Sequence, residues 1–502
     1  MAPAATLNLD SVSSMHDENT AEAMLQQGGL REAEAICKGL SASEAADCAA
    51  YRNLANAYRK TGKYSEAVLL LEQLLELQPD DPETHKDLGN VLKEQGRFEA
   101  AIDAYESAIR LNPLFAQAHI NLGLVHHEKG DFDAATSAFH EAIRLDPRKP
   151  EAHYNLGISL HEQGQLTAAI ASYARALQLK PNYPDAHNNL SSTLLLAGDY
   201  AVGWKEYEHR GDPADLAQGS FRARLKMPLW NGIELAKGDK LLLIAEQGLG
   251  DTLQFMRYVI PLRNQGIAAS LCPHPQLTTL IQESGIDPAP LKPSQAIQVR
   301  DGHWMPLLSL PRYLGVGPEN PIITTPYIAT SADMVDQWKW TMAQERRPII
   351  GIHWQGNPDV EQTNLRGRSL ALEAFAPIAA RTKATLVSLQ HGFGSEQLDT
   401  CSFRDRFASC QEEISKAFNF PETAAIIANC DLIVTSDSCV AHLAAGMGKR
   451  TWLLLHKMPD WRWGMEGSSS FWYPSMRLFR QKERGNWNDV LKQVAAELQK
   501  DS

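Results

Sequence analysis

The stretch DLGNVLKEQGRFEAAIDAYESAIRLNPLFAQAHINLG, from Asp87 to Gly123, decides the fold of the N-terminal part of this chain. It begins and ends on nearly the same three residues, 34 positions apart, and the spacing continues on both sides. Glycine recurs at this interval at positions 28, 62, 96, 130, 164 and 198. A period of this length predicts helix–turn–helix units that stack into a solenoid.

Alanine and proline also recur at intervals of 34 residues, each at a fixed distance from the glycines. Alanine lies five residues after the glycines at 33, 67, 101, 135 and 169, and proline closes four units at 79, 113, 147 and 181. Glycine permits a left-handed cap at the end of a first helix. Proline stops the second helix because it has no N–H to continue the ladder. With Gly89, Tyr105 and Ala108 in the expected places, the pattern resembles the tetratricopeptide repeat family.

We therefore expect a solenoid over residues 17–212, behind a disordered N-terminus at 1–16. Five units run from about 48 to 212, preceded by a worn half-unit with Gly28 and Ala33. The last unit is also atypical, as terminal units are where they meet solvent or another domain.

Composition excludes several classes of protein. The 502 residues carry a formal net charge of −12 without a basic stripe, which argues against a nucleic-acid partner. No apolar run approaches the roughly 20 residues of a membrane span, and the N-terminus does not look like a secretory signal. The seven cysteines are scattered without a C-x-x-C pair, so we expect free thiols in a cytoplasmic protein and no metal site.

The repeat period stops near residue 210, and the pattern changes. Proline and glycine punctuate residues 213–238 without a helical period, which indicates a linker. Beyond it, short apolar runs alternate with helical segments. The predicted strands are 240–245, 268–272, 349–353, 385–389, 432–435 and 451–455, and the predicted helices include 422–428, 440–445 and 487–498. Such alternation is typical of parallel sheets covered by helices.

Two series of this kind predict the fold class: an α-solenoid followed by two Rossmann-like α/β halves, at 239–330 and 331–502. In open α/β sheets, ligands bind outside the carboxyl ends of the strands. Residues that directly follow a predicted strand are therefore the candidates for a functional site.

The first candidate is the segment Glu246 to Asp251, which reads EQGLGD. Gly248 and Gly250 allow a tight turn and a close approach of the backbone to a ligand. Asp251 stands where the next helix begins, so it is either an N-cap or a carboxylate facing the site as a general base. One residue can do both.

The second candidate is the loop after the strand at 349–353. A strand that runs into a glycine loop offers backbone N–H groups to phosphate, and arginine adds bidentate contacts to a diphosphate. The residues assigned to donor binding on this side are Trp354, Gly356, Arg366, Arg368 and Gln390. The alternative is a solvated loop with ordinary surface arginines.

The third candidate, TSDSCVAH from Thr435 to His442, lies between a strand end and a helix. Hydroxyl and N–H groups at a helix N-terminus favour an anionic ligand, and Asp437 can accept from a sugar hydroxyl. The alternatives are capping by Asp437 or Ser438 and an ordinary hydrogen-bonded helix histidine at position 442.

The fourth candidate is an aromatic cluster over residues 460–463 and 471–474. These rings either line a sugar or base pocket or pack the last helix onto the domain. We expect packing for most of them, with Trp461 and Arg462 as the exceptions.

Taken in order, GDTLQFMRY, the G-N-P loop with RGRS, SDSCVAHLAAGMGK and PDWRW resemble the heptosyltransferase-like family 9 glycosyltransferases over roughly residues 239–500. The resemblance implies a GT-B fold, an acceptor in the first half, a nucleotide-sugar donor in the second, and neither metal nor other cofactor. The residues carried over are Asp251 as the base and Asp437, Ser438 and His442 for the donor. Because Cys439 replaces the family's glycine and Arg368 its lysine, the donor's identity stays open.

The solenoid supplies a candidate partner site. One position of each first helix carries an amide or carboxylate, at Asn53, Asp87, Asn121, Asn155 and Asn189. Amide side chains both donate to and accept from a peptide backbone, and tetratricopeptide-fused protein O-glycosyltransferases use a similar asparagine ladder. The alternative is that asparagine is common at this position whatever such repeats bind.

The sequence thus predicts a cytoplasmic enzyme that moves a sugar from a nucleotide-sugar to a protein or peptide on the concave face of the repeats. A homo-oligomer is left open. Two rival hypotheses remain: an enzyme acting on a lipid or polysaccharide, with the repeats docking it to a membrane complex, and a non-catalytic scaffold with a degenerate GT-B domain.

Overall fold

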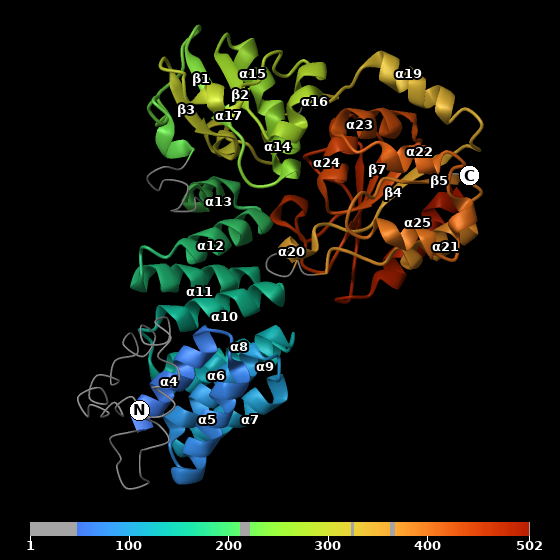
Figure 1. Ribbon diagram of the computed structural model, residues 1–502. Coiled ribbons are helices and arrows are strands. Elements are labelled where there is room, and N and C mark those ends of the chain that lie inside the picture. The colour runs from blue at the N-terminus through green and yellow to red at the C-terminus, as the bar shows by residue number, and fades with distance from the viewer. Residues whose placement is uncertain (1–47, 211–220, 323–325, 362–366, 501–502) are drawn as a thin grey trace, which may run out of the picture. The chain divides into compact units, whose positions relative to one another are not determined.

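The computed structural model describes residues 48–210, 221–322, 326–361 and 367–500 (Figure 1). The chain divides into two compact units, Met1–Asn189 and Leu190–Ser502. The predicted disordered segment 1–16 and the half-unit with Gly28 and Ala33 lie outside the described residues.

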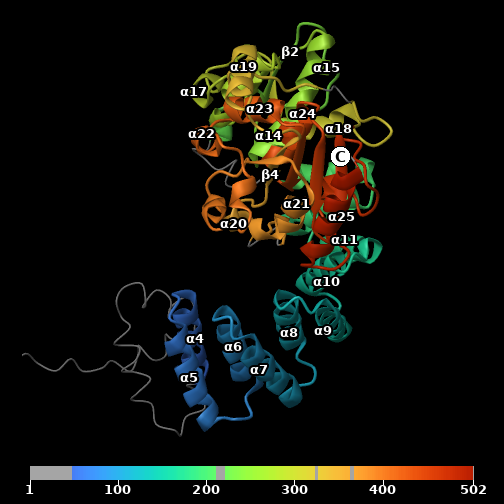
Figure 2. The same cartoon turned by 90° about the vertical axis from the view of Figure 1, so that its right-hand side faces the viewer.

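The first unit consists of consecutive helix pairs, as the 34-residue period predicts (Figure 1 and Figure 2). The pairs are α4 (Cys48–Lys60) with α5 (Tyr64–Leu77), α6 (Pro82–Glu94) with α7 (Phe98–Leu111), α8 (Ala116–Glu128) with α9 (Phe132–Leu145), and α10 (Pro150–Glu162) with α11 (Leu166–Leu179). Helices α12 (Pro184–Leu196) and α13 (Tyr200–Tyr207) complete the period.

Two sets of glycines explain how the helices of a pair fit together. Gly62, Gly96, Gly130, Gly164 and Gly198 end the first helices with φ between 73° and 91°. This is the left-handed conformation that the pattern predicts. A second set lets an aromatic ring of the next helix lie against the first. A Cβ on Gly89 would lie 2.6 Å from a ring carbon of Tyr105, and Gly123 meets Phe139 in the same way.

The second unit contains two parallel sheets, each covered by helices, as the strand–helix alternation predicts. The three-stranded sheet has the order β2-β1-β3, built from β1 (Lys240–Ile244), β2 (Ala268–Cys272) and β3 (His303–Pro306). The five-stranded sheet has the order β5-β4-β6-β7-β8, built from β4 (Ile349–His353), β5 (Thr385–Ser388), β6 (Leu432–Ser436), β7 (Thr451–Leu455) and β8 (Met476–Arg480).

The helices of the second unit connect these strands in order. Those after β1 and β2 are α14 (Leu249–Phe255), α15 (Val259–Asn264), α16 (Thr278–Glu283) and α17 (Pro293–Ala296), followed after β3 by α18 (Leu310–Leu314) and α19 (Ala332–Thr341). Those around the second sheet are α20 (Pro358–Glu361), α21 (Ala376–Arg381), α22 (Gln411–Lys416), α23 (Phe420–Asn429), α24 (Cys439–Gly446) and α25 (Trp487–Lys500).

Strands β3 and β8 have no counterpart among the predicted strands. β8 reads Met-Arg-Leu-Phe-Arg and forms one edge of its sheet, so its apolar run is interrupted by charge. β3 has only four residues, two of them half-buried. Both are too short or too polar to resemble the continuous apolar runs of central parallel strands.

The segment predicted as a linker at 213–238 is partly packed structure. Residues 213–220 lie outside the described residues, but the chain after them pairs with β3. The Trp230 N–H donates to the carbonyl oxygen of Trp304 over 2.8 Å, and the Trp304 N–H donates to that of Pro228 over 3.0 Å. Trp230 is buried, so its ring contributes to the fold of the first sheet.

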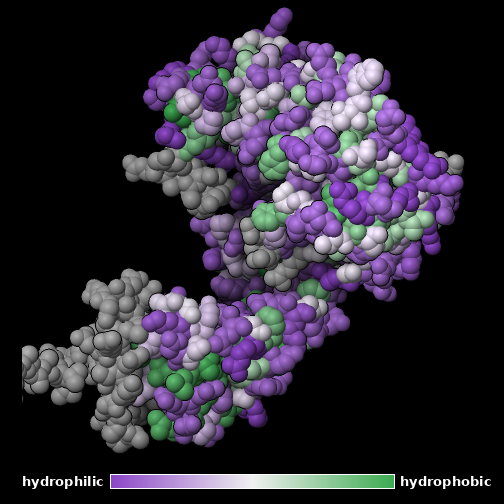
Figure 3. Space-filling view, turned by 45° about the vertical axis from the view of Figure 1, so that its right-hand side comes forward, coloured by the Kyte–Doolittle hydropathy of each residue, from purple (hydrophilic) through white to green (hydrophobic). Residues whose placement is uncertain are grey.

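In the second sheet β4 lies between β5 and β6, so the strand order reverses at β4. Ligands bind at such a switch point, beyond the carboxyl ends of the strands. Strands β4 and β6 are buried along their whole length. Figure 3 shows that hydrophilic residues cover most of the surface on the face in view. Of the helices described, none is both long and apolar enough to cross a membrane.

Candidate functional site

The segment after β1 carries the predicted base. Helix α14 begins one residue after Gly248, so Asp251 occupies the third helical position and not the N-cap. The Gly248 N–H donates to Oδ2 of Asp251 over 2.8 Å. The carboxylate therefore caps the helix from inside its first turn, as the third residue of a capping box does. This corrects the N-cap assignment, and the role as base stays a prediction.

Arg462 pairs with the other oxygen of Asp251. Its three nitrogens contact Oδ1 of Asp251, Oδ1 of Asp460 at 2.9 Å and Oε1 of Gln254. Its Cζ lies 4.2 Å from the centre of the Trp461 ring. The Arg462 side chain is only 8% exposed, so fixed protein groups replace water around its charge. Burial raises the pKa of Asp251 above its ordinary value, and Arg462 acts in the opposite direction.

Gln390 forms hydrogen bonds to the backbone of the loop after β4. Its Oε1 accepts from the backbone N–H groups of Trp354 (3.2 Å) and Gln355 (3.0 Å). Its Nε2 donates to the carbonyl oxygens of Gln355 (2.9 Å) and Phe393 (2.7 Å). The Gln390 amide is thus engaged with backbone on both sides, and it sets the shape of the loop. A direct contact between Gln390 and the donor stays a prediction.

Trp354 belongs to the core of the second sheet. Its side chain is fully buried, among residues such as Ile352 and Leu370. Its N–H is bonded to Gln390, and its carbonyl oxygen accepts from the Leu370 N–H over 3.0 Å. The ring therefore packs in the core, and its Nε1 is buried without a hydrogen-bond partner among the described residues. A donor contact by Trp354 stays a prediction.

Gly356 and Arg368 lie against each other. A Cβ on Gly356 would lie 2.4 Å from Nη2 of Arg368, so a side chain at this position would displace the guanidinium. Arg368 donates from Nε to Glu361 over 3.1 Å and from Nη1 to the carbonyl oxygen of Asp437 over 3.3 Å. The guanidinium therefore stands between the loops after β4 and β6, beside the switch point. Arg366 lies outside the described residues.

Asp437 and Ser438 follow β6 at the start of α24. Oδ2 of Asp437 accepts from Nε1 of Trp463 over 2.8 Å. Burial, with a further contribution from Asp460, raises the pKa of Asp437 to about 6. Oγ of Ser438, the residue before the helix, lies 3.2 Å from Nδ1 of His353. The eight-residue helix α24 therefore begins directly after two polar residues, one with a buried carboxyl group and one with a hydroxyl group.

His442 is buried in the second turn of α24. Its Nδ1 lies 2.8 Å from the Tyr473 hydroxyl, and its ring stacks on Trp463 at 5.6 Å. A Cβ on Gly250 would lie 3.0 Å from the His442 ring. The glycine therefore permits close packing of α14 on α24. Burial lowers the pKa of His442 well below its ordinary value, so the ring is neutral. Donor contacts by Gly248, Gly250 and His442 stay predictions.

The aromatic cluster mostly packs the domain, as expected. Trp463, Trp472 and Tyr473 are buried, and Trp461 is buried too. The Trp461 ring meets that of Trp472 with a centroid distance of 5.9 Å. Of the two predicted exceptions, Arg462 does contact the candidate base, whereas Trp461 lies behind it and contacts the guanidinium.

Two residues of the site escaped the sequence reasoning. Gln247 has φ of 58°, a left-handed conformation that is uncommon for a residue with a Cβ. The sequence gives no signal for this positive φ, because glycine is the residue that usually indicates a left-handed position. Asp460 lies two residues before Arg462 and pairs with it. The opposite charges of Asp460 and Arg462 on either side of Trp461 are the sequence feature from which this ion pair could be predicted.

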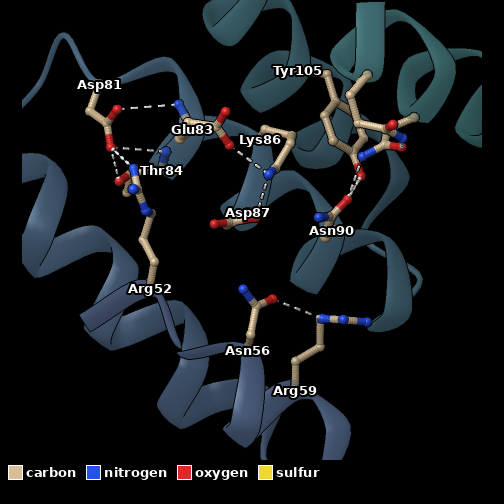
Figure 4. Close-up of polar contacts among 12 residues, drawn as sticks. Arg52, Asn56, Arg59, Asp81, Glu83, Thr84, Lys86, Asp87, Asn90 and Tyr105 are labelled. Atoms are coloured by element: carbon tan, nitrogen blue, oxygen red, sulfur yellow. Dashed lines mark hydrogen bonds and ion pairs between the residues drawn. The ribbon is translucent and has the colours of Figure 1, made fainter. Parts of the chain in front are cut away.

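The ladder positions of the solenoid partly bond to their own neighbours. Figure 4 shows Lys86 beside Asp87, with Nζ and Oδ1 separated by 3.1 Å. Asp87 is buried, and burial raises its pKa. Nδ2 of Asn121 donates to Oδ1 of Asn90 over 2.8 Å, and the Tyr105 hydroxyl donates to the same oxygen over 2.8 Å.

The remaining ladder residues differ from one another. Nδ2 of Asn189 donates to the Tyr154 hydroxyl over 3.1 Å. Asn53 is half-buried on α4. Asn155 is also half-buried, and its side chain has no hydrogen bond to any part of the chain that the structure describes. Peptide binding by the ladder stays a prediction. The Asn155 amide is the candidate for it, because it has no hydrogen bond within the described residues.

Models of two known families match different parts of the chain. Tetratricopeptide repeat models match residues 55–96, 89–130 and 128–184. The model of glycosyltransferase family 9 (heptosyltransferase) matches residues 403–457. That match includes Asp437 and His442 but neither Asp251 nor Arg462.

Individual proteins extend the comparison. Protein FlbA of Caulobacter vibrioides is 25% identical over 343 residues, which are 61% of this chain and 54% of FlbA, so the chain spans about half of this relative's length. MamA from Desulfovibrio magneticus RS-1 is 21% identical over 32% of this chain and 92% of its own (TM-score 0.30). YrrB, a TPR protein with an unusual peptide-binding site, is 22% identical over 32% and 83% (TM-score 0.28).

The family models thus identify a tetratricopeptide-repeat region at 55–184 and a glycosyltransferase family 9 region at 403–457.

Proposed function

We propose that this glycosyltransferase moves a sugar from a nucleotide-sugar donor to a hydroxyl of a protein held by the repeats, with Asp251 as the general base. The observation that carries the proposal is that both sheets contribute to one polar network. Arg462 pairs with Asp251 beyond β1, and Asp460 raises the pKa of Asp251 and of Asp437 beyond β6. A base and a donor-binding helix start thus share one electrostatic environment.

The proposed step uses these groups directly. The acceptor O–H bond breaks and its proton moves to the Asp251 carboxylate. The acceptor oxygen bonds to the anomeric carbon of the donor, and the bond from that carbon to the diphosphate oxygen breaks. Arg368 and the N–H groups at the start of α24 stabilise the negative charge that develops on the leaving nucleoside diphosphate. Although Asp251 accepts from Gly248 and Arg462, a carboxylate has about four lone-pair sites, so capacity for the proton remains.

The loop after β5 offers a place for the nucleobase. Phe393 and Phe418 are 56% and 72% exposed, unusual for large apolar side chains. The His391 ring meets Phe418 edge-on at 5.3 Å, and its Nε2 is buried without a hydrogen-bond partner in the described structure. Aromatic faces stack on any base, and the histidine nitrogen would select among them.

The repeats are the proposed acceptor site, with Asn155 and Asn121 contacting an extended backbone. Support comes from the repeat architecture and from the available Asn155 amide. A protein acceptor fits this arrangement better than a lipid, because amide groups match peptide N–H and C=O groups.

Substitution of the base tests the proposal. Asp251→Asn keeps an oxygen for the helix cap but cannot take a proton. We expect nucleoside diphosphate release from UDP-, GDP-, ADP- or dTDP-sugars to fall by about 10²–10⁴-fold, the usual contribution of a general base. The thermal shift with UDP, GDP, ADP or dTDP should be kept, and exposed Asp399→Ala serves as the control. Wild-type turnover by Asp251→Asn removes it from the mechanism, and no shift with any nucleotide favours a scaffold.

A further inference from the structure

Helix α13 is a repeat helix by its sequence and part of the catalytic unit by its packing. It lies in the 34-residue period after Gly198, yet the compact unit that contains it begins at Leu190. Trp204 and Tyr207 are each 3% exposed. Nε1 of Trp204 donates to the carbonyl oxygen of Val316 over 2.7 Å. The helix is thus anchored to the α/β fold.

The same helix holds the segment that leads to Asp251. The Tyr207 hydroxyl donates to Oε1 of Gln247 over 3.1 Å. Arg210, directly after the helix, donates from Nε to Glu246 over 3.2 Å. Arg222 contacts the second oxygen of Glu246 over 2.8 Å. Two consecutive residues of the loop after β1 are therefore fixed from α13 and the chain that follows it.

Gln247 needs such support. Its left-handed backbone conformation is disfavoured for every residue with a Cβ, and Gln247 is itself exposed. The next residue is Gly248, whose N–H donates to Asp251. If Gln247 relaxed to a commoner conformation, the direction of that N–H would change, and the Asp251 carboxylate would lose one of its two fixed donors.

The helix also supports the other donor to Asp251. The rings of Trp204 and Tyr207 contact that of Trp461 with centroid distances of 5.3 Å and 6.1 Å. Trp461 in turn lies against the Arg462 guanidinium. Both donors to Asp251, the Gly248 N–H and Arg462, are thus backed by one helix.

We propose that α13 is a positioning element of the reaction: Tyr207 holds Gln247 in its left-handed conformation and thereby aims Asp251. The inference rests on the proposed function, because it presumes that Asp251 acts on the acceptor. It assigns the last repeat helix a role in turnover that is separate from acceptor binding.

The variant Tyr207→Phe removes only the hydroxyl. We expect kcat for nucleoside diphosphate release to fall about fivefold, the effect of one neutral hydrogen bond, while the donor KM stays the same. Amide exchange of residues 246–251 should rise. Tyr258→Phe is the matched control, because the Tyr258 hydroxyl is buried without a partner in the described structure.

The double variant Tyr207→Phe/Gln247→Gly supplies the decisive comparison. Glycine adopts positive φ without a steric cost, so the double variant should regain most of the lost kcat and slow the exchange of residues 246–251 again. A purely structural role of Tyr207 predicts no such rescue. Wild-type kcat in Tyr207→Phe, or failure of glycine to rescue it, overturns the inference.

The two proposals fail separately. If Asp251→Asn turns over normally, the base assignment fails, and amide exchange still reports whether Tyr207 holds the loop. If Asp251→Asn is inactive while Tyr207→Phe has normal kcat and normal exchange, the positioning role alone is wrong.

Discussion

The repeats and the α/β unit use polar side chains in different ways. In the repeats, the bond from Asn121 to Asn90 joins neighbouring repeats and residues 31 positions apart. In the α/β unit, the pair of Asp251 and Arg462 joins segments 211 positions apart. Repeat contacts are local and nearly independent of one another, whereas the contacts of the α/β unit converge on the candidate site. A change in the repeats should therefore have a graded effect, and a change in the network around Arg462 should affect several groups together.

The largest effect is expected for Arg462→Met. The change leaves Asp251 and Asp460, whose side chains are each only 19% exposed, without their cation. Removing one partner of a buried ion pair costs about 3–5 kcal/mol, because the remaining charge stays desolvated. Denaturant unfolding of the full chain measures this loss, and nucleoside diphosphate release should disappear with it.

The matched change in the repeats is Lys129→Met. Lys129 and Glu99 form an exposed pair with Nζ and Oε2 separated by 2.8 Å. Surface pairs contribute at most about 1 kcal/mol, so we expect a small loss. If Arg462→Met is as mild as Lys129→Met, the distinction between the two networks does not hold.

The next effect concerns pH and Asp437. Its pKa is raised from 3.8 to about 6, so between these values the folded chain binds more protons than the unfolded chain. Stability therefore falls as the pH rises through this window and stays lower above it. Asp437→Asn removes that penalty and should stabilise the chain at pH 7.5 by up to about 3 kcal/mol, with little gain near pH 4. Melting temperatures at the two pH values measure this.

The same variant should weaken the nucleotide-sugar site, which a stability effect alone would not do. Asp87→Asn is its counterpart in the repeats, because burial raises the pKa of Asp87 as well. We expect Asp87→Asn to leave the thermal shift with UDP, GDP, ADP or dTDP unchanged and Asp437→Asn to reduce it. Equal shifts in both variants would mean that Asp437 has only a structural role.

The smallest effect is expected for the ladder. Asn121→Ala/Asn155→Ala removes two amides that can bond to a peptide backbone, each contributing about 1 kcal/mol. Acceptor KM should rise by about thirtyfold, because the two contributions add and 1.4 kcal/mol is about tenfold, while nucleoside diphosphate release to water stays unchanged. A series of protein acceptors measured with one donor provides the test. Normal acceptor KM in the double variant would refute peptide binding by the ladder.

Most of the fold could be predicted from the sequence, because its signals are local. The 34-residue period places each repeat helix, and the predicted strand at 268–272 coincides with β2. Apolar runs bounded by glycine or proline identify buried parallel strands without tertiary information. The edge strand β8 could not be predicted in this way, because two of its five residues are half-buried arginines that interrupt the apolar run.

Less of the candidate site could be predicted. Asp251 and Asp437 are candidates because they follow predicted strands, and Arg368 because an arginine in a glycine loop can contact a diphosphate. The structure places Asp251 after β1 and brings Arg368 to the backbone of Asp437 after β6. The packing of the Trp354 ring in the core could not be predicted, since a strand-end position does not reveal which way a ring turns. The support of Gln247 by Tyr207 was invisible because the two lie 40 positions apart.

By itself, the sequence determined where the repeats run, where they stop and which α/β segments follow, because periodicity and apolar runs depend on residues near in the chain. Only the tertiary structure decided that α13 packs with the catalytic unit, that Asp251 is a capping residue paired with Arg462, and that a glutamine takes a glycine-like conformation. These features depend on which distant surfaces meet, and spacing along the chain carries no record of that.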